Sequence, residues 1–509
     1  MPSNLYIFVN WACGAILAAI LLSRFRPEWP ICRQLLSPKT RSIRIGLLLV
    51  LLAVAALQFF HNALYEPMFQ RAKKGDAMLD PFSPHEARAG QPLRPPKSLD
   101  FAEYWLGSTD LAQGNNLYRD MAEYIHFKTI QFREQGKEIQ MARYAEQVPP
   151  SREGFDRLER LCEENGIPVF PFFTYPPTWY LLFTPFTWMD WRDAHDVWLV
   201  ANLLFVGASV VLILLAVGYR PRSSEESLAL ATLILGFSPL IFSLKECQAN
   251  SLVLLTVCAA LYLASRGKNA GPGALIALGA AIKVFPGILL LYFLWKRKFR
   301  LAAFGFASLA VIMLLSISVI GWDVHYWYFF KVAPTWASNI SAFDMNQSIA
   351  GVAARALVGG EGISPIVHRP GLARWLITLS QVVLLAMVVW TCRTRARRLT
   401  DPVWMEIGLV IVFYQLASTW VLIHHLQWLL IPYLLVWGIA ARDVSRPSFG
   451  LLAAIGLSYL LTGVEYVYYR EAFRGGAMAL FASLKFFGML VLFFALVAAV
   501  RRLRPEKDS

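Results

Sequence analysis

Apolar residues in this chain gather into runs of about twenty residues, the length that an α-helix needs to cross the hydrocarbon core of a bilayer. The runs recur along most of the chain, and polar stretches separate them. Hydrophobic residues make up 57% of the 509 residues and charged residues only 16%, whereas soluble domains are about 45–50% apolar and about 25% charged. The sequence therefore predicts an all-α polytopic membrane protein.

The formal net charge is +14, but its distribution argues against a nucleic-acid partner. Basic residues stand in short clusters at the ends of apolar runs, as the positive-inside rule expects. A nucleic-acid-binding protein carries its basic patch on a soluble domain. The polar stretches of this sequence contain no such patch.

The spacing of the six cysteines gives no sign of a disulfide framework or a metal site. Most of them fall in or beside apolar runs, whereas Cys162 lies in a long polar loop. The sequence also lacks a Walker motif and a GxGxxG motif, so an ATP-driven machine is not indicated. We therefore expect neither a metal nor another cofactor.

Two basic clusters set the expected topology. An excess of Arg and Lys predicts that the segment 24–44 is cytoplasmic, and the segment 393–398 marks the same side. Residues 5–22 have no basic region before them and no small-residue cleavage site, which predicts a retained first span. With a second span at 43–64, the polar loop 65–170 falls on the outer side. About 12 to 13 helical crossings are expected in total.

Residues 168–188 leave the topology of the middle region open. Prolines interrupt this apolar run, and proline at membrane depth requires neighbours that re-satisfy the freed backbone groups. The run is therefore either a kinked span or a re-entrant hairpin. In the second case residues 271–294 become a pair of half-helices with Lys283 near the apex. The positive-inside rule favours the second case.

The loop 65–170 is far longer than ordinary connections, and such loops are usually functional or disordered. Its first part is rich in proline and is therefore not expected to be regular helix. The segments 118–135 and 151–164 have helical spacing with charged faces. These segments predict short amphipathic helices along the membrane surface.

The candidate catalytic residue lies in the segment 97–120 of this loop. Asp100 precedes an aromatic cluster just outside a membrane span. An acidic residue in that position can serve as a general base that faces a lipid-borne substrate. The alternative is that Asp100 caps a short helix at 101–111, because Asp is a favoured N-cap residue.

Further polar residues fall on the same outer side in the expected topology. They are Glu103, Tyr104, Gln248, Asn250, Asp344, Asn346, Gln347, Arg355, His424 and His425. Ionisable residues at the membrane are costly, and they usually serve a function. Each residue also has a structural alternative. The amides of Gln248 and Asn250 can bridge helices, Arg355 can snorkel to head groups, and Asn346 can cap a helix.

Several short motifs follow one another in a fixed order. They are D-F-x-x-Y with G-x-N-x-Y, F-x-Y-P-P with L-x-x-x-P, Q-x-N, K-x-x-P before a basic cluster, N-Q-S with a downstream Arg, and Trp with His-His before a Pro-containing span. Their residues are Asp100, Phe101, Tyr104, Gly114, Asn116, Tyr118, Phe173, Tyr175, Pro176, Pro177, Leu181, Pro185, Gln248, Asn250, Lys283, Pro286, Asn346, Gln347, Ser348, Arg355, Trp420, His424, His425 and Pro432. Over residues 98–440 this order resembles glycosyltransferase family 87 of the GT-C superfamily.

The resemblance implies a GT-C fold and a multi-pass enzyme of the plasma or inner membrane with an extracytoplasmic active site. The implied reaction moves a sugar (mannose, another hexose or a pentose) from a polyprenyl-phosphate donor to a glycolipid or glycan acceptor. A sugar phosphodiester has a good leaving group, so one base suffices. Direct displacement would invert the anomeric centre.

The implied catalytic residue is Asp100. The implied substrate-binding residues are Phe101, Tyr104, Tyr175, Gln248, Asn250, Lys283, Asn346, Gln347, Arg355, His424 and His425. Cations near the departing phosphate would stabilise its growing charge. Lys283, Arg355 and one of the histidines are the candidates.

The sequence departs from the family pattern in its N-terminal span, in insertions on the acceptor side, and at Cys247. That cysteine stands where Gly often precedes the Gln of Q-x-N. The resemblance divides the chain into an extra transmembrane helix with a cytoplasmic basic loop (1–42), a GT-C transmembrane module (43–440) and C-terminal transmembrane helices (441–509).

A transporter or flippase for a lipid-linked saccharide is the alternative function, because it would also place polar residues inside a helix bundle. Inverted repeats with paired broken helices would support it. No internal repeat is visible in the sequence.

Overall fold

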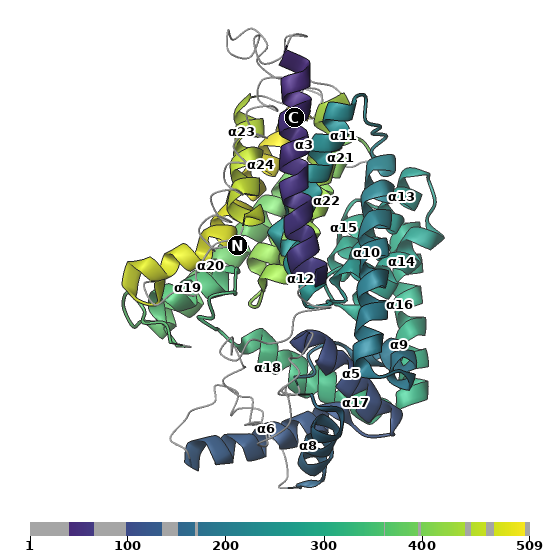
Figure 1. The fold of residues 1–509 in the computed structure, drawn as a ribbon, viewed down its shortest axis with the longest axis vertical. Coiled ribbons are helices and arrows are strands. Elements are labelled where there is room, and N and C mark those ends of the chain that lie inside the picture. The colour runs from purple at the N-terminus through teal and green to yellow at the C-terminus, as the bar shows by residue number, and fades with distance from the viewer. Residues whose placement is uncertain are drawn as a thin grey trace.

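The computed structural model describes residues 40–65, 98–134, 151–167, 172–360, 362–394, 399–442, 449–464 and 473–503. These residues form helices and connecting loops, and no β-strand occurs among them (Figure 1). The expected first span, most of the basic segment 24–44 and the proline-rich part of the loop lie outside the described residues.

Six helices in the described part are long and apolar enough to cross a membrane. They are α3 (Arg41–Phe59) with its π-helical end η2 (Phe60–Tyr65), α10 (Trp191–Ala216), α16 (Phe299–Ile320), α20 (Pro370–Thr391), η5 (Ile423–Leu429) with α22 (Leu430–Arg442), and η7 (Gly476–Ser483) with α24 (Leu484–Leu503). The chain is therefore a multi-pass membrane protein.

Other apolar helices are shorter or broken. They are α11 (Ser224–Leu235), α12 (Ser238–Lys245), α13 (Asn250–Ser265), α14 (Ala270–Ile282), α15 (Gly287–Trp295), α21 (Asp401–Ala417) and α23 (Phe449–Gly463). The pair α11 and α12 passes the same test together but bends by 51°, which would give a seventh span. The larger number of crossings expected from the sequence stays a prediction.

The structure shows broken helices in the middle region, and the choice between a kinked span and a re-entrant hairpin at 168–188 stays a prediction. The described residues 172–188 form only the short helix α9 (Pro177–Phe183) and the 3-10 turn η3 (Thr184–Trp188). These two elements pack against α5 (Leu99–Ala112) and do not form a membrane-length helix. The helix at 271–294 is broken, as the re-entrant alternative predicts, and Lys283 lies directly after α14.

Both amphipathic helices expected in the long loop are present. They are α6 (Leu117–Glu134) and α8 (Glu153–Asn165), which pack against each other. Arg157 on α8 donates from Nη2 to Asp120 Oδ2 of α6 at 2.6 Å, and Lys128 Nζ lies 2.8 Å from Glu159 Oε1. Buried Phe155 stacks on Tyr124 with a centroid distance of 5.2 Å. This pair of helices is therefore fixed by charges and aromatic rings together.

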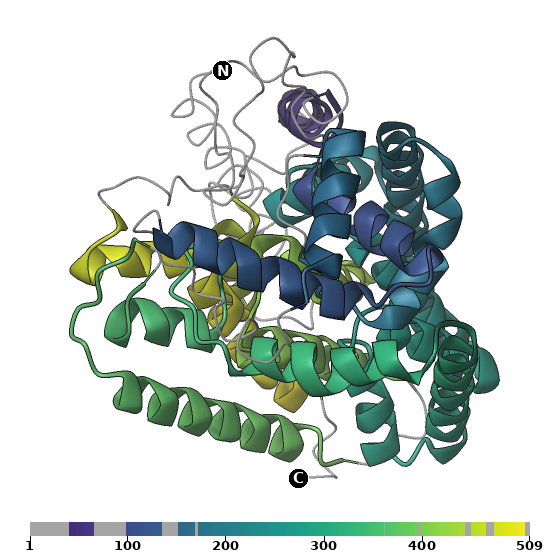
Figure 2. The ribbon, with the colours of Figure 1, turned by 90° about the horizontal axis from the view of Figure 1, so that it is seen from below.

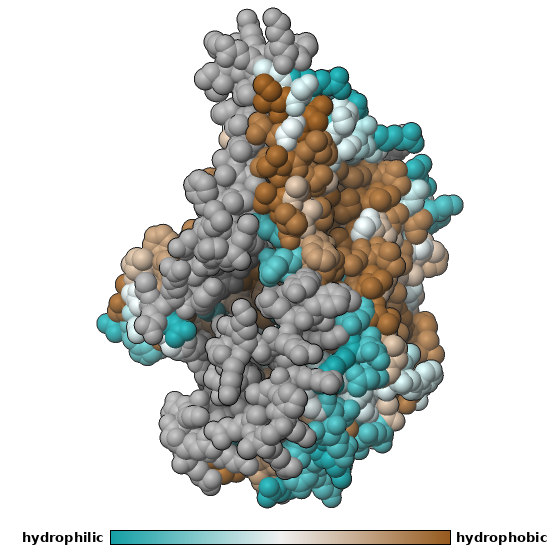
Figure 3. All heavy atoms as spheres, in the orientation of Figure 1, coloured by the Kyte–Doolittle hydropathy of each residue, from teal (hydrophilic) through white to brown (hydrophobic). Residues whose placement is uncertain are grey.

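The loop helices gather at one end of the molecule. Figure 1 shows α5, α6, α8, α17 (Trp322–Trp327) and α18 (Ala333–Ser338) below the long helices, and Figure 2 shows α6 lying across this end. Hydrophobic residues cover the visible side of the long helices, whereas hydrophilic residues predominate at the lower right of the view, on the visible part of the end that carries α8 (Figure 3). The described helices α5, α6 and α8 of the long loop therefore lie together at one end of the apolar bundle.

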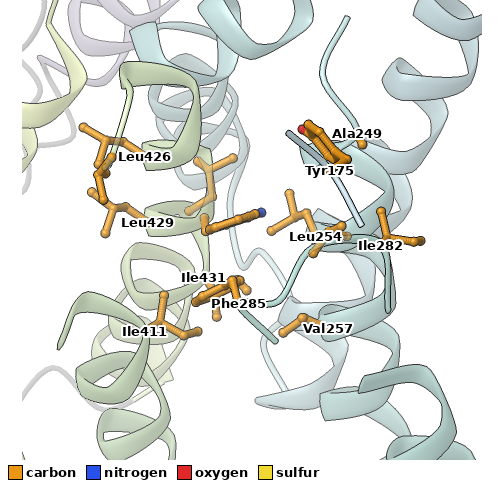
Figure 4. Packing of buried hydrophobic residues seen from close by; sticks show 14 of the residues in the cluster. Tyr175, Ala249, Leu254, Val257, Ile282, Phe285, Ile411, Leu426, Leu429 and Ile431 are labelled. Atoms are coloured by element: carbon orange, nitrogen blue, oxygen red, sulfur yellow. The ribbon is translucent and has the colours of Figure 1, made fainter. Parts of the chain in front are cut away.

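A continuous apolar core joins the broken helices to α21 and α22. Figure 4 shows Leu254, Val257, Ile282 and Phe285 facing Ile411, Leu426, Leu429 and Ile431. The ring of Phe285, in the break between α14 and α15, stacks on Trp428 with a centroid distance of 4.0 Å. The chain at this break is therefore packed against Trp428 through Phe285, two residues after Lys283.

Two glycines bring α14 and α16 into close contact, as small residues do between membrane helices. A Cβ atom on Gly273 would lie 2.6 Å from both Gly305 N and Leu301 O. We expect Gly273→Leu to lower the free energy of unfolding by about 1–3 kcal/mol, the usual cost of overpacking. The matched control is Gly207→Leu on α10, where a Cβ atom would meet nothing within 4 Å. Thermal unfolding in detergent measures both, and equal melting temperatures would contradict the predicted contact.

Candidate functional site

The candidate base, Asp100, is the second residue of α5 and does not cap this helix. The N-cap is Ser98, whose Oγ accepts from Phe101 N at 3.1 Å. Asp100 lies in the first turn, where a negative charge is favourable near the helix N-terminus. The interpretation of Asp100 as an N-cap is therefore wrong. Serine is as good a cap as Asp, and Ser98 two residues earlier performs that role.

Ser98 also ties α5 to the loop that follows α12. Its hydroxyl donates to the carbonyl oxygen of Glu246 at 2.8 Å. Gln248 lies two residues further along this loop, and its Nε2 donates to Asp100 Oδ2. The start of α5 and the loop that leads into the Q-x-N motif are thus joined at two points.

The oxygen of the Gln248 amide accepts hydrogen bonds from two tyrosines. Its Oε1 accepts from Tyr175 OH at 2.6 Å and from Tyr104 OH at 2.9 Å. The Tyr104 hydroxyl lies 2.8 Å from the Tyr175 hydroxyl. Three motifs that lie far apart in the sequence therefore meet at a single amide.

Lys283 completes the network from the opposite side. Its Nζ donates to Tyr175 OH at 2.9 Å and to Asn250 Oδ1 at 2.8 Å. It also lies 4.7 Å from the centroid of the Tyr175 ring and 5.4 Å from that of Trp428. An unbroken chain of hydrogen bonds thus runs from the ammonium group through Tyr175 and Gln248 to the Asp100 carboxylate.

The environment tunes Asp100 toward the properties of a base. Burial raises the pKa of Asp100 to about 6, against the opposing effects of the Gln248 hydrogen bond and the Lys283 charge. Asp100 belongs to α5, outside the helices that qualify as membrane spans. A carboxylate with a pKa near 6 is ionised at neutral pH and accepts a proton more readily than an ordinary aspartate.

The two histidines lie beside Asn250. Asn250 Nδ2 donates to the carbonyl oxygen of His424 at 3.0 Å. The imidazole of His425 accepts from Leu422 N at 3.1 Å through Nδ1, and it stacks on Trp428. Nδ1 of buried His424 has no hydrogen-bond partner among the described residues. His424 is therefore the histidine of the pair whose Nδ1 is open to a ligand.

Arg355 forms a second polar cluster with Asn346 and Gln347. Its guanidinium is fully buried and donates to Phe343 O at 2.7 Å, to Asn346 O at 2.8 Å and to Ser483 Oγ. The interpretation that Arg355 snorkels to head groups is therefore wrong. All three side-chain nitrogens of Arg355 already donate within the protein. The cluster therefore links the loop that contains Phe343 and Asn346 to Ser483, the last residue before α24.

Asn346 and Gln347 also bond within the protein. Asn346 Oδ1 accepts from Val421 N at 3.1 Å, and Gln347 Nε2 donates to Ala482 O at 2.7 Å. The cap of α19 (Ile349–Leu357) is Ser348, whose Oγ accepts from Gly351 N. The interpretation of Asn346 as that N-cap is therefore wrong.

Three further candidates lie around these two groups. Phe101 is buried against Phe183, with ring centroids 5.4 Å apart. Glu103 is half-buried on α5. Burial raises the pKa of Asp344, and its Oδ1 has no hydrogen-bond partner among the described residues. Asp344 is thus a second carboxylate with a free oxygen.

The sequence alone did not indicate that Ser98 caps α5, nor which residues contact the loop before Gln248. A serine directly before an apolar helical segment is a recognisable start signal, so Ser98 was within reach. Within the described ranges no group of three or more His, Cys, Asp or Glu side chains is arranged to hold a metal ion. The expectation that the reaction needs no metal stays a prediction.

The family comparison matches the half of the chain that carries the broken helices. The model of glycosyltransferase family 87 matches residues 173–419. Over residues 173–419 the chain is therefore similar to glycosyltransferase family 87. This match includes Tyr175, Gln248 and Lys283 but stops short of Asp100 on one side and His424 on the other. It falls inside the expected GT-C module, and the proposed division of the chain stays a prediction.

Two curated relatives are named as polyprenol-phosphate-mannose-dependent mannosyltransferases. The chain is 28% identical over 298 residues to the polyprenol-phosphate-mannose-dependent alpha-(1-2)-phosphatidylinositol mannoside mannosyltransferase of Mycobacterium tuberculosis. The aligned region covers 56% of this chain and 66% of that protein. It is 26% identical over 309 residues to the protein of the same name from Mycolicibacterium smegmatis, again over 66% of that protein. The chain thus spans slightly less than two thirds of these relatives.

Proposed function

We propose that this protein transfers a sugar from a polyprenyl-phosphate donor to a glycolipid or glycan acceptor, with Asp100 as the general base. The observation that carries the proposal is the hydrogen-bonded chain from Lys283 through Tyr175 and Gln248 to Asp100. It puts a cation and a carboxylate on either side of one small polar cluster at the junction of the loop helices and the membrane bundle. The similarity of residues 173–419 to glycosyltransferase family 87 supports the same reaction class.

The reaction needs few groups from the protein. The acceptor hydroxyl attacks the anomeric carbon, the new C–O bond forms, and the bond to the phosphate oxygen breaks. Asp100 takes the proton of the hydroxyl, and the phosphate leaves as an anion, so no general acid is required. A single displacement inverts the anomeric centre. A hydrolase would instead need two carboxyl groups around the sugar.

Lys283 is the better of the two proposed phosphate ligands. An ammonium group has three donors, and Lys283 uses two of them on Tyr175 and Asn250. The third is available for a phosphate oxygen, where its charge would stabilise the transition state. Arg355 spends its side-chain nitrogens on protein acceptors. We therefore assign the donor phosphate to Lys283, with His424 beside it.

The names of the relatives suggest the substrates. They describe mannosyl transfer from polyprenol-phosphate-mannose to phosphatidylinositol mannosides. We propose mannose or another hexose as the sugar for this chain. The acceptor is assigned only to the class of extracytoplasmic glycolipids and glycans, because α6 and α8 lie largely in segments where the sequence departs from the family pattern.

The first prediction concerns the base. Asp100→Asn keeps the size of the side chain, and Ser98 keeps the cap, so the melting temperature should hardly change. Turnover should fall by a factor of about 10² to 10⁴, the usual contribution of general base catalysis. The measurement is transfer of labelled mannose from a polyprenyl phosphate in proteoliposomes. Asp156→Asn is the control, because Asp156 is an exposed carboxylate on α8.

An active Asn variant would contradict the assignment and make Asp344 the next residue to test. A flippase would give a different pattern. It would move the lipid-linked sugar across the bilayer without forming a new glycosidic bond, so neither the parent nor the control would yield a labelled product.

The second prediction concerns pH. A base works only when it is ionised, so kcat/KM should be full above the pKa of Asp100, about 6, and should fall as the pH drops through that value. The Lys283 charge lowers the pKa of Asp100. Lys283→Met should therefore move the acid limb to higher pH and also reduce the rate. An unchanged limb in Lys283→Met would contradict the coupling between the two residues.

The third prediction concerns the side of the membrane. We propose that the loop helices face the extracytoplasmic side. A cysteine at exposed Glu164 on α8 should react with a membrane-impermeant maleimide in intact cells. A cysteine at exposed Arg300, in the first turn of α16 at the end of a basic cluster, should react only after lysis. Labelling is measured above that of the parent chain, and the reverse pattern would place the site in the cytoplasm.

A further inference from the structure

The residue before Gln248 has an unusual backbone conformation. Cys247 has a φ of +47°, in the left-handed region that residues with a Cβ atom adopt at a cost and glycine adopts freely. The family pattern noted above often has glycine at this position. A cysteine here must therefore be held in place by its surroundings.

Helix α10 provides that hold through two contacts. Trp198 Nε1 donates to the carbonyl oxygen of Cys247 at 2.9 Å. The Sγ atom of Cys247 lies 3.2 Å from Nε2 of His195, and both residues are fully buried. On the other side of the ring, Nδ1 of His195 lies 2.8 Å from Asp196 Oδ1.

The direction of these hydrogen bonds follows from the groups involved. A carboxylate only accepts, so the proton of the imidazole lies on Nδ1 and is donated to Asp196. Nε2 is then the acceptor, and the thiol of Cys247 donates to it. Asp196 thereby fixes the tautomer and the orientation of His195, as carboxylates do for other functional histidines.

His195 also contacts the other side of the Asp100–Gln248 pair. Its ring meets Phe101 edge-on, with centroids 5.3 Å apart, and Phe101 is the residue after Asp100. The same imidazole thus packs against the neighbour of the base and bonds the neighbour of the amide that orients the base.

We propose that Asp196, His195 and Cys247 form a positioning relay that holds Gln248 against Asp100. The role of the relay in turnover rests on the proposed function, whereas its role in placing Gln248 does not. The order carboxylate, imidazole, thiol is also that of a nucleophilic triad. Here the thiol is fully buried, so the three residues act on the backbone of Gln248 and not on a substrate.

Two substitutions of Cys247 separate the thiol from the backbone strain. Cys247→Ala keeps a Cβ atom in the left-handed conformation and removes the bond to His195, so the loop should relax and Gln248 should move off Asp100. Cys247→Gly removes the same bond but also removes the strain, so Gln248 should stay. The relay therefore predicts that the glycine variant resembles the parent more than the alanine variant does, although alanine is closer to cysteine in size.

The readout is the protonation of Asp100 itself. The infrared carbonyl band of the protonated acid, identified as the band lost in Asp100→Asn, is followed across pH in the full-length protein. Losing a hydrogen bond to the ionised form raises a pKa. Cys247→Ala and His195→Leu should therefore move the midpoint up by about one pH unit, the range expected for a weakened bond to a charged group. Lys283, Tyr104 and Tyr175, which face Asp100 in the network, stay unchanged in every variant.

Kinetics give the second readout. In Cys247→Ala the acid limb should shift with the infrared midpoint, and kcat should fall about tenfold with little change in the KM for the donor. Cys258→Ala is the matched control, because Cys258 on α13 is an equally buried thiol. It should leave the midpoint and the acid limb of the parent in place.

The outcomes decide the inference in either direction. Midpoints equal to that of the parent in both Cys247→Ala and His195→Leu would overturn the relay, whatever the turnover. A shifted midpoint in a protein that transfers no sugar would support the relay and refute the proposed function. If the alanine variant does not fold, the midpoint of His195→Leu decides: a raised midpoint supports the relay, and the midpoint of the parent overturns it.

Discussion

The hydrogen bond from the Gln248 amide to the Asp100 carboxylate is the contact on which the site depends. It joins α5 of the long loop to the loop between α12 and α13, and every other contact of the network reaches Asp100 through that amide. The amide is satisfied on both ends, because its oxygen accepts from Tyr175 and Tyr104. Buried polar groups are tolerated only when they are paired in this way. The Gln248 amide therefore has protein partners at both of its ends.

Breaks in the membrane helices make such a site possible. An unbroken helix uses its backbone groups internally and offers only side chains, whereas a break frees backbone groups and turns the chain inside the bundle. Lys283 lies in one break and Gln248 follows another short helix, α12. The stacked rings of Phe285 and Trp428 pack beside the break that contains Lys283. Packing thus offsets the cost of placing polar groups at this depth.

The sequence predicted the membrane helices, the helices α6 and α8 and the position of Lys283 at a helix break, because periodicity and proline act locally. It could not decide whether Asp100 or Asn346 caps a helix, since the choice depends on which neighbouring serine reaches the backbone. In both cases it was a serine, Ser98 or Ser348. It also gave no view of His195, because this residue belongs to no motif and meets Cys247 only in the folded chain.

The separation of the two halves of the site along the chain has a consequence for biosynthesis. Asp100 precedes Gln248 by 148 residues, and Ser98 precedes Glu246 by the same number. Helix α5 therefore leaves the ribosome long before the loop that receives it, and the membrane-length helix α10 and the bent pair α11 and α12 are made in the meantime. Contacts between such distant segments form slowly. Helix α5 is thus made early and docks late, so a chain stalled before α12 would present Asp100 without Gln248.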